Sequence, residues 1–192
     1  QGRSALLGMA LAGALAAAPG PAARAETGDA FAMRVTQQTY LAYVITGVPQ
    51  VDEVSRAGLQ HLSDLVRART AAEPGGAIGV NPETDELAFF PLLYWPVVAE
   101  EPDLSETAIE RFNAFMRNGG TILFDTRDQG LGGASGLAGG GGPGAQRLRS
   151  LTRGLDIPPL APLPPDHVLT RAFYLLQEFP GRYAGGDLWV ET

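Results

Sequence analysis

Short apolar runs, separated by longer polar and amphipathic stretches, mark the middle of the chain. The runs cover residues 41–46, 92–95 and 121–125, and they are rich in β-branched and aromatic side chains. Their apolar character is nearly continuous, which is typical of strands that are buried on both faces of a parallel sheet. The segments 73–76 and 81–86 are rich in Gly, Pro, Asn and Asp and are predicted to be loops.

Two amphipathic helices are predicted between these strands. The first is expected to be capped by Asp52 and to run to about Arg69, with Gly58 allowing close packing on the sheet. The second is expected to start after Ser105 and to stop at Gly119, a residue typical of helix C-termini. Apolar residues at helical spacing predict the buried faces. For the first helix they are Val54, Gly58, Leu62, Leu65 and Val66, and for the second Ile109, Phe112, Phe115 and Met116.

The order strand, helix, strand, helix, strand predicts an α/β fold with a doubly wound, mostly parallel sheet covered by helices on both faces. After the third strand we expect a Gly-rich flexible insertion at 129–144, a short helix at 146–153 and a Pro-rich connector at 158–165. Residues 168–176 suit either a helix or a strand, and 188–190 is predicted to be the last strand. We expect the sheet to be truncated at the C-terminus and the chain to be a fragment of a longer protein.

The first 25 residues differ in character from the rest. Arg3 precedes an uncharged run rich in Ala and Leu at 5–18, and a small-x-small sequence at 23–25 closes it. This layout predicts a secretory signal or a membrane anchor, with a buried helix as the alternative, and it leaves 26–192 as the α/β domain. We therefore expect the domain on the periplasmic side of a bacterial inner membrane, with other envelope or inner-membrane proteins as partners.

The composition excludes several classes of chemistry. The chain has 14 Arg and no Lys against 21 acidic residues, a net charge of −7, which argues against a nucleic-acid-binding groove. Without Lys there is neither a Schiff base nor a phosphate-binding P-loop. Without Cys there is no disulfide, thiolate nucleophile or zinc knuckle. No cofactor and no metal site is predicted.

Several blocks of the sequence together resemble a bacterial family, the domain of unknown function 4159. The matching blocks are 41–47, 52–59, 85–95, 118–128, 166–169 and 179–183. The resemblance runs from about residue 30 to the C-terminus. It implies a fold like that of class I glutamine amidotransferases, which is flavodoxin-like. It also implies that longer members carry a BatA-like membrane region with two spans before this domain. The resemblance implies no activity.

Complete catalytic motifs are missing. An amidotransferase needs a nucleophilic Cys, which the chain lacks. A serine elbow needs Gly-x-Ser-x-Gly, and the nearest sequence, around Ser135, lacks the second Gly. The Gly-rich run also does not match the glycine spacing of dinucleotide-binding loops. A flexible spacer is therefore the favoured interpretation of this run. Of the two His, His61 lies beside the predicted apolar face of the first helix, where a packed or half-exposed imidazole is the simpler interpretation.

Ligands of doubly wound sheets bind outside the carboxyl ends of the strands. The predicted ligand-binding residues at those ends, together with an Asp–His pair after the Pro-rich connector, are Thr46, Tyr94, Trp95, Asp125, Arg127, Asp128, Asp166 and His167. Arg127 suits a carboxylate or phosphate. The alternatives are a structural Asp–Arg network that ties loops together and, for Asp166, a helix cap.

The expected function is therefore a non-catalytic ligand-binding or protein-interaction module of a membrane-anchored bacterial envelope protein. The alternative is a hydrolase that acts on an envelope carbohydrate or ester through Asp125, Asp128 and His167. The sequence leaves open whether the chain is an enzyme. The missing catalytic motifs favour a protein without catalytic activity.

Overall fold

A computed structural model describes residues 28–128, 142–172, 175–176 and 188–191 of the chain. The signal-like segment at 1–25, the motif around Ser135 and most of the Gly-rich stretch lie outside the described residues. No helix within the described ranges has both the length and the apolar character needed to cross a bilayer.

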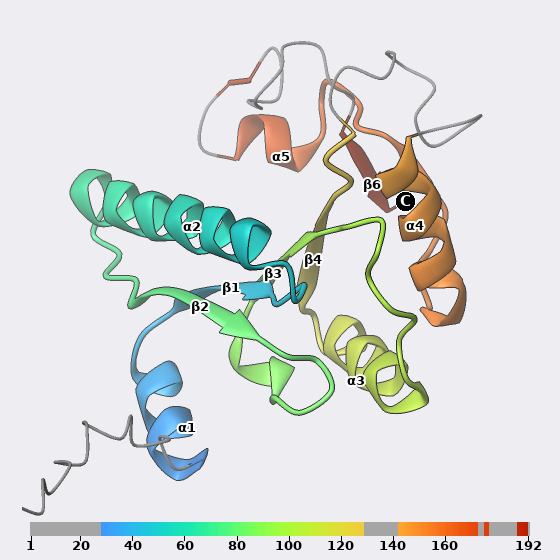
Figure 1. Ribbon diagram of the computed structural model, residues 1–192. Helices are drawn as coiled ribbons and strands as arrows, with labels where there is room; N and C mark the ends of the chain where they lie inside the picture. Colours follow the sequence, from blue (N-terminus) through green and yellow to red (C-terminus); the bar gives the residue numbers. More distant parts are fainter. Residues whose placement is uncertain (1–27, 129–141, 173–174, 177–187, 192) are drawn as a thin grey trace, which may run out of the picture.

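Helices and strands alternate along the described residues (Figure 1). The helices are α1 (Gly28–Gln37), α2 (Pro49–Arg69), α3 (Glu106–Arg117), α4 (Pro143–Leu151) and α5 (Val168–Arg171). The strands are β1 (Tyr40–Val44), β2 (Gly76–Val80), β3 (Leu92–Pro96), β4 (Thr121–Asp125), β5 (Leu160–Pro162) and β6 (Trp189–Glu191). Two 3₁₀ turns cover Leu87–Phe89 and Thr152–Gly154.

Four parallel strands form the central sheet in the order β2-β1-β3-β4. The register pairs Tyr43 with Tyr94 and Trp95 with Phe124, so the strands point the same way. The predicted α/β, doubly wound, flavodoxin-like fold is thereby confirmed. From β1 the chain turns outward to β2 and then crosses back to β3 on the other side of β1. The strand order therefore reverses between β1 and β3, which is the topological switch point of such a sheet.

Helices cover the sheet on both faces, with α2 on one side and α1 and α3 on the other (Figure 1). The main core lies on the side of α3, where the rings of Trp95 and Phe112 stack at 4.7 Å between centroids. The predictions for α3 are confirmed: Ser105 accepts a hydrogen bond from the Ala108 amide, and Gly119 has a φ of 90°. The core consists of Val35, Tyr40, Ala42, Val44, Val80, Leu87, Phe90, Leu93, Trp95, Val97, Phe112, Phe115, Leu148, Leu151 and Leu155.

Strand β2 occupies a segment whose first residue was predicted to be in a loop. It is only five residues long and two of them are Gly, so it carries little strand signal. It forms because it pairs with β1 along its whole length. A Cβ atom at Gly79 would lie 3.0 Å from the side chains of Tyr43 and Ile45, so glycine leaves the space that these larger residues fill.

Two predictions for α2 are wrong. The helix begins at Pro49 rather than after Asp52, and its N-cap residue is Val48. Its buried side chains are also not the predicted apolar set. They are Val51, Ser55 and Ser63. Small side chains on that side bring the helix close to the sheet, so the apolar residues on the neighbouring side are left at the surface.

The C-terminal elements differ from the predictions in placement. The last strand is present as β6, but it pairs antiparallel with β5 in a separate two-stranded sheet, and β5 lies inside the predicted Pro-rich connector. Helix α4 starts at Pro143, within the predicted insertion and three residues before the predicted helix. The ambiguous segment at 168–176 starts as the helix α5.

Candidate functional site

The carboxyl ends of β1, β3 and β4 meet at one edge of the sheet, as the sequence predicts. Because the three strands are parallel neighbours, Thr46, Trp95 and Asp125 come to the same edge. The pairing of β3 and β4 continues beyond the strands, since the Val97 amide donates to the carbonyl oxygen of Asp125 at 2.9 Å. This edge carries the candidate site.

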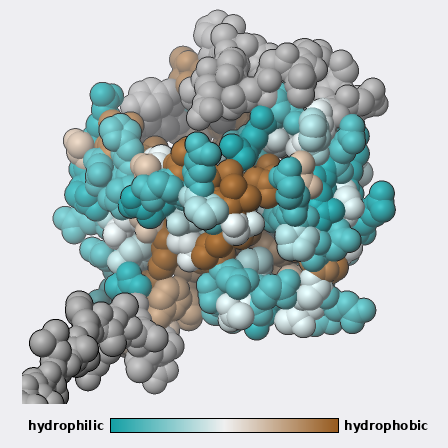
Figure 2. Space-filling view, in the orientation of Figure 1, coloured by the Kyte–Doolittle hydropathy of each residue, from teal (hydrophilic) through white to brown (hydrophobic). Residues whose placement is uncertain are grey.

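An open cleft of about 290 Å³ lies at this edge. Four segments line it: the start of α2, the loop after β3, the loop after β4 and the start of α4. Its lining residues are Val48, Val51, Val97, Val98, Ala99, Glu100, Thr126, Arg127, Pro143 and Gly144. Because it lies between segments that follow β1 and β3, the cleft is at the switch point of the sheet. Figure 2 shows hydrophobic atoms at the surface near the centre of the view, where Figure 1 places the N-terminal end of α2 and β3.

The first wall is held by Thr46 and Asp52. The backbone amide and the hydroxyl of Thr46 both donate to Oδ1 of Asp52, each at 2.8 Å. The Thr46 hydroxyl oxygen in turn accepts from the Val48 amide at 3.1 Å. Gly47, between them, has a φ of 78°, a conformation that favours glycine. Thr46 is therefore used to fix the turn from β1 into α2 and is itself buried.

The second wall is the loop after β3, and a buried pair supports it. The indole Nε1 of Trp95 donates to Oε1 of Glu101 at 2.9 Å. Burial raises the pKa of the Glu101 carboxyl, and the hydrogen bonds from Trp95 and Val98 and the charge of Arg147 oppose this rise. Trp95 is fully buried with its ring in the core, so its side chain does not face the edge as predicted. The alternation of side chains along β3 points residue 95 to the α3 face.

Asp125 and Arg127 form the third wall at the end of β4. Oδ2 of Asp125 accepts from the Tyr94 hydroxyl at 2.7 Å, and Oδ1 accepts from the Arg127 amide at 2.9 Å. Arg127 has a φ of 57°, a left-handed conformation that is costly for a residue with a side chain. The Asp125 bond holds this conformation. The Arg127 side chain is exposed in the cleft wall and has no partner among the described residues.

The fourth wall is the start of α4, which Asp128 and Gly144 hold against β4. The two carboxylate oxygens of Asp128 accept from the amides of Gly144 and Ala145, at 2.9 and 2.6 Å. Asp128 thus caps α4 from outside the helix. A Cβ atom at Gly144 would collide with the carbonyl oxygen of Thr126, so the helix lies against the strand end at a distance that only glycine allows.

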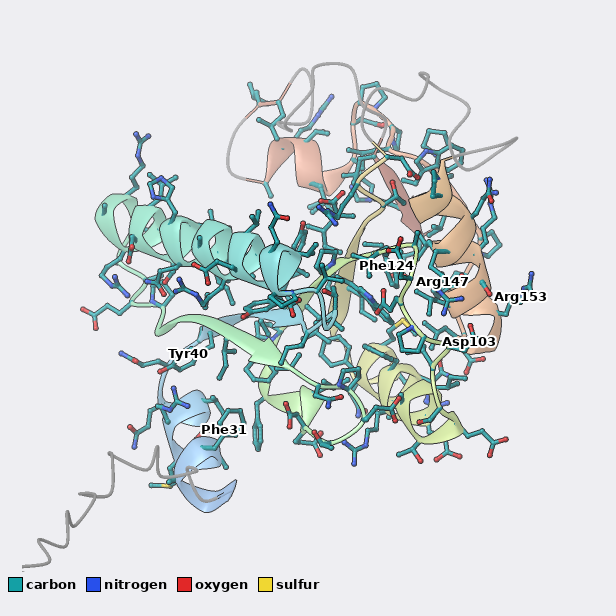
Figure 3. The ribbon with its side chains drawn as sticks, viewed as in Figure 1. Phe31, Tyr40, Asp103, Phe124, Arg147 and Arg153 are labelled. Atoms are coloured by element: carbon teal, nitrogen blue, oxygen red, sulfur yellow. The ribbon has the colours of Figure 1, made fainter. Side chains whose placement is uncertain are left out.

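An ion pair joins α4 to the loop after β3. Figure 3 shows Arg147 on α4 and Asp103 on that loop, and Nη1 of Arg147 lies 2.8 Å from Oδ1 of Asp103. Two buried polar atoms nearby, Oε2 of Glu101 and Nε of Arg147, have no hydrogen-bond partner among the described residues. The loop after β3, the loop after β4 and the start of α4 are therefore joined to one another through α4 before any ligand binds.

Asp166 and His167 lie at the start of α5. His167, not Asp166, is the N-cap residue of this short helix, and its Nδ1 accepts from the Leu169 amide at 3.2 Å. Within the described ranges no hydrogen bond joins His167 to Asp125 or Asp128. Asp125, Asp128 and His167, the three groups of the predicted hydrolase, each accept hydrogen bonds from nearby backbone amides. Such bonds are what the alternative prediction, a structural network that ties loops together, expects.

Most residues that line the cleft are not among the predicted site residues. The valines after β1 and β3 carry no polar signal, and Pro143 and Gly144 fall within the predicted flexible insertion. The only sequence signal for these lining residues is their position in short segments that follow predicted parallel strands. In the described part of the chain, no group of three or more acidic or His side chains is placed to hold a metal ion.

The model of the family described as Domain of unknown function (DUF4159) matches residues 40–190, which include the central sheet and all four walls of the cleft. No curated protein matches the chain.

Proposed function

We propose that this chain, which belongs to the family described as Domain of unknown function (DUF4159), binds a small anionic molecule in the cleft at the carboxyl edge of its sheet. The observation that carries the proposal is Arg127, whose guanidinium lies in the cleft wall and has no partner among the residues that the structure describes. A guanidinium binds carboxylate or phosphate through paired, charge-assisted hydrogen bonds. The strained backbone of Arg127 supports this role, because such strain gathers at functional sites.

The size and lining of the cleft restrict the ligand. About 290 Å³ is at the small end of small-molecule pockets. The Val48, Val51, Val97 and Val98 side chains favour an apolar body next to the anionic group. Since three of the four walls are already joined to one another, the ligand is expected to bind without a large rearrangement.

The proposal is binding without turnover. Both oxygens of Asp128 accept backbone amides, and Asp125 accepts from Tyr94 and Arg127. In the described part of the chain, neither carboxylate is hydrogen-bonded to a His that would act as a base. For this reason we do not extend the proposal to hydrolysis of a carbohydrate or ester.

The test is a titration of the ¹⁵N-labelled protein with inorganic phosphate and with succinate. Both probes are expected to shift the amide resonances of Val98, Thr126 and Gly144. Arg127→Gln is expected to abolish these shifts, whereas Arg153→Gln, a change at an exposed Arg on the turn after α4, is expected to keep them. Equal shifts in Arg127→Gln and in the unchanged protein, or no shifts in the latter, would contradict the proposal.

We further propose that the domain lies on the periplasmic side of a bacterial inner membrane, where its partners would be other envelope proteins. Support comes from the basic residue, short apolar run and small-x-small sequence within residues 1–25. A fusion of alkaline phosphatase to Thr192 is expected to be active in bacteria, because this enzyme folds only outside the cytoplasm. Activity that persists after deletion of 1–25, or no activity at all, would contradict this location.

A further inference from the structure

Two charged side chains of opposite sign line the cleft at the carboxyl edge. Glu100 lies in the loop after β3 and Arg127 lies in the loop after β4, so the two charges come from different walls. Both residues are exposed. The other lining residues carry no charged side chain, and they are Val48, Val51, Val97, Val98, Ala99, Thr126, Pro143 and Gly144. The cleft is therefore positive at one wall, negative at another and otherwise largely apolar.

Neither of these two charges is neutralised within the described part of the chain. There, the side chains of Glu100 and Arg127 form no ion pair and no hydrogen bond, either with each other or with another residue. The charged groups of neighbouring residues, in contrast, are hydrogen-bonded or ion-paired within the protein, and they are Asp52, Glu101, Asp125, Asp128 and Arg147. Because no ion pair joins Glu100 to Arg127, a ligand that binds both must carry two separated charges.

Backbone hydrogen bonds hold both charged residues in place before a ligand binds. The Glu101 amide donates to the carbonyl oxygen of Val98 at 3.2 Å, which closes a turn with Glu100 at its tip. Glu101 and Val98 are themselves buried, so the base of this turn is fixed to the core. At the other wall, Oδ1 of Asp125 accepts from the Arg127 amide at 2.9 Å. Charges that are already positioned reduce the ordering that binding has to impose.

We infer that the ligand is a small aliphatic amino acid whose anionic group and ammonium group lie at opposite ends of an apolar chain. The anionic group binds Arg127, the ammonium group binds Glu100, and the aliphatic body lies against the valine side chains of the cleft. A dicarboxylate of similar length would place its second anionic group against Glu100, so it fits the cleft less well. The inference rests on the proposed function, since it names the ligand class of the same cleft.

Titration of the ¹⁵N-labelled protein at neutral pH with probes of equal carbon count tests the inference. The probe 4-aminobutyrate carries both charges, butyrate carries only the anionic group, and succinate carries an anionic group at each end. We expect 4-aminobutyrate to bind about threefold to fivefold more tightly than butyrate, the effect of one exposed ion pair, and succinate to bind more weakly than 4-aminobutyrate. Equal affinities for 4-aminobutyrate and butyrate, with amide shifts at Thr126 and Gly144, would overturn the inference and leave the proposed anion site intact.

Substitutions at Glu100 separate this inference from the proposed function. Glu100→Gln is expected to bind 4-aminobutyrate and butyrate with equal affinity, because Arg127 still binds the anionic group of both. Glu100→Lys is expected to reverse the order and to favour succinate over 4-aminobutyrate. Glu110→Gln, at an exposed acidic residue on α3, is the matched control and should keep the preference of the unchanged protein. A full preference in Glu100→Gln would overturn the role of Glu100, and no shift with any probe in the unchanged protein would overturn the anion site as well.

Nuclear Overhauser effects between 4-aminobutyrate and ¹³C-labelled protein test the orientation of the chain in the cleft. Ala99 and Thr126 directly precede Glu100 and Arg127, line the cleft and carry methyl groups. The methylene group next to the ligand nitrogen is expected to lie near the Ala99 methyl group, and the methylene group next to the carboxylate near that of Thr126. The reversed pattern would overturn the assignment of the two ends.

Discussion

The indole Nε1 of Trp95 lies 2.9 Å from Oε1 of Glu101 and donates a hydrogen bond to it. The pair joins the core to the loop that forms one wall of the cleft. Trp95 is fully buried and Glu101 is 9% exposed, so the carboxylate has lost most of its water. Its second oxygen has no partner among the described residues. The loop is thus held by a group that is costly to ionise in the folded protein.

Glu101→Gln is expected to change how stability depends on pH. Burial raises the pKa of Glu101 in the folded state above its ordinary value of 4.5. The folded protein therefore holds this proton more tightly than the unfolded chain does. The resulting stabilisation is complete below the ordinary value and is lost as the pH rises through the raised pKa. Relative to Glu101→Gln, which keeps an oxygen for Trp95, the unchanged protein should lose stability across that window.

Urea unfolding from about pH 4 to about pH 8 measures this difference. Glu100→Gln, at an exposed neighbouring residue, serves as the control and should follow the unchanged protein. If the curves for Glu101→Gln and the unchanged protein ran parallel over the whole range, burial would not govern this carboxyl.

Asp128→Ala is expected to lower the free energy of unfolding by about 0.5–2 kcal/mol, because α4 loses the carboxylate that caps it. Asp128→Asn should recover part of the loss, since its amide oxygen still accepts one of the two backbone amides. The measurement is chemical denaturation. Asp156→Ala, which breaks an exposed ion pair with Arg117 at 3.6 Å, should cost about 1 kcal/mol or less. An equal loss in both variants would argue against the cap.

Two glycine substitutions are expected to act in opposite directions. Gly58→Ala should raise the stability of the protein by about 0.5–1 kcal/mol, because the position is helical and open. Gly144→Ala should lower stability by about 1–3 kcal/mol, because the new methyl group meets the Thr126 carbonyl and pushes α4 away from β4. Thermal unfolding compares them. Stabilisation by Gly144→Ala would show that α4 does not lie against the strand end.

Arg127→Gly is expected to separate stability from binding. Glycine adopts a φ of 57° without strain, so the variant should be as stable as the unchanged protein or up to about 1 kcal/mol more stable. Without the guanidinium it should no longer respond to phosphate or succinate in the titration. A marked loss of stability would indicate that the Arg127 side chain has a structural role.

The elements that the sequence predicted well are those whose signals are local. Ser105 caps α3 and Gly119 ends it, because both roles depend on the backbone within a few residues. The strand at 121–125 was predicted with its observed bounds because three apolar residues and a Thr between a Gly pair and an Asp suit a strand. Strand β2 was missed because its stability comes from pairing with β1, a partner more than thirty residues away along the chain.

The candidate site shows the same division. Parallel strands bring their carboxyl ends to one edge, so strand order alone placed Thr46, Tyr94, Asp125 and Arg127 there. What each side chain does at the edge depended on its neighbours in space. Asp125 binds Tyr94 across two strands, whereas Arg127 is left facing the cleft.

The sequence by itself determined the class of fold, the family and the carboxyl edge where polar residues gather, because hydrophobic period, turn residues and chain order act locally. Only the tertiary structure decided which face of α2 is buried, which strands pair and which side chains line the cleft. A helix with apolar residues around much of its surface can pack in several rotations, and the sheet selects the one that brings the small Ser55 and Ser63 against it. Packing is a property of pairs of surfaces, and a single segment of sequence specifies only one of the two.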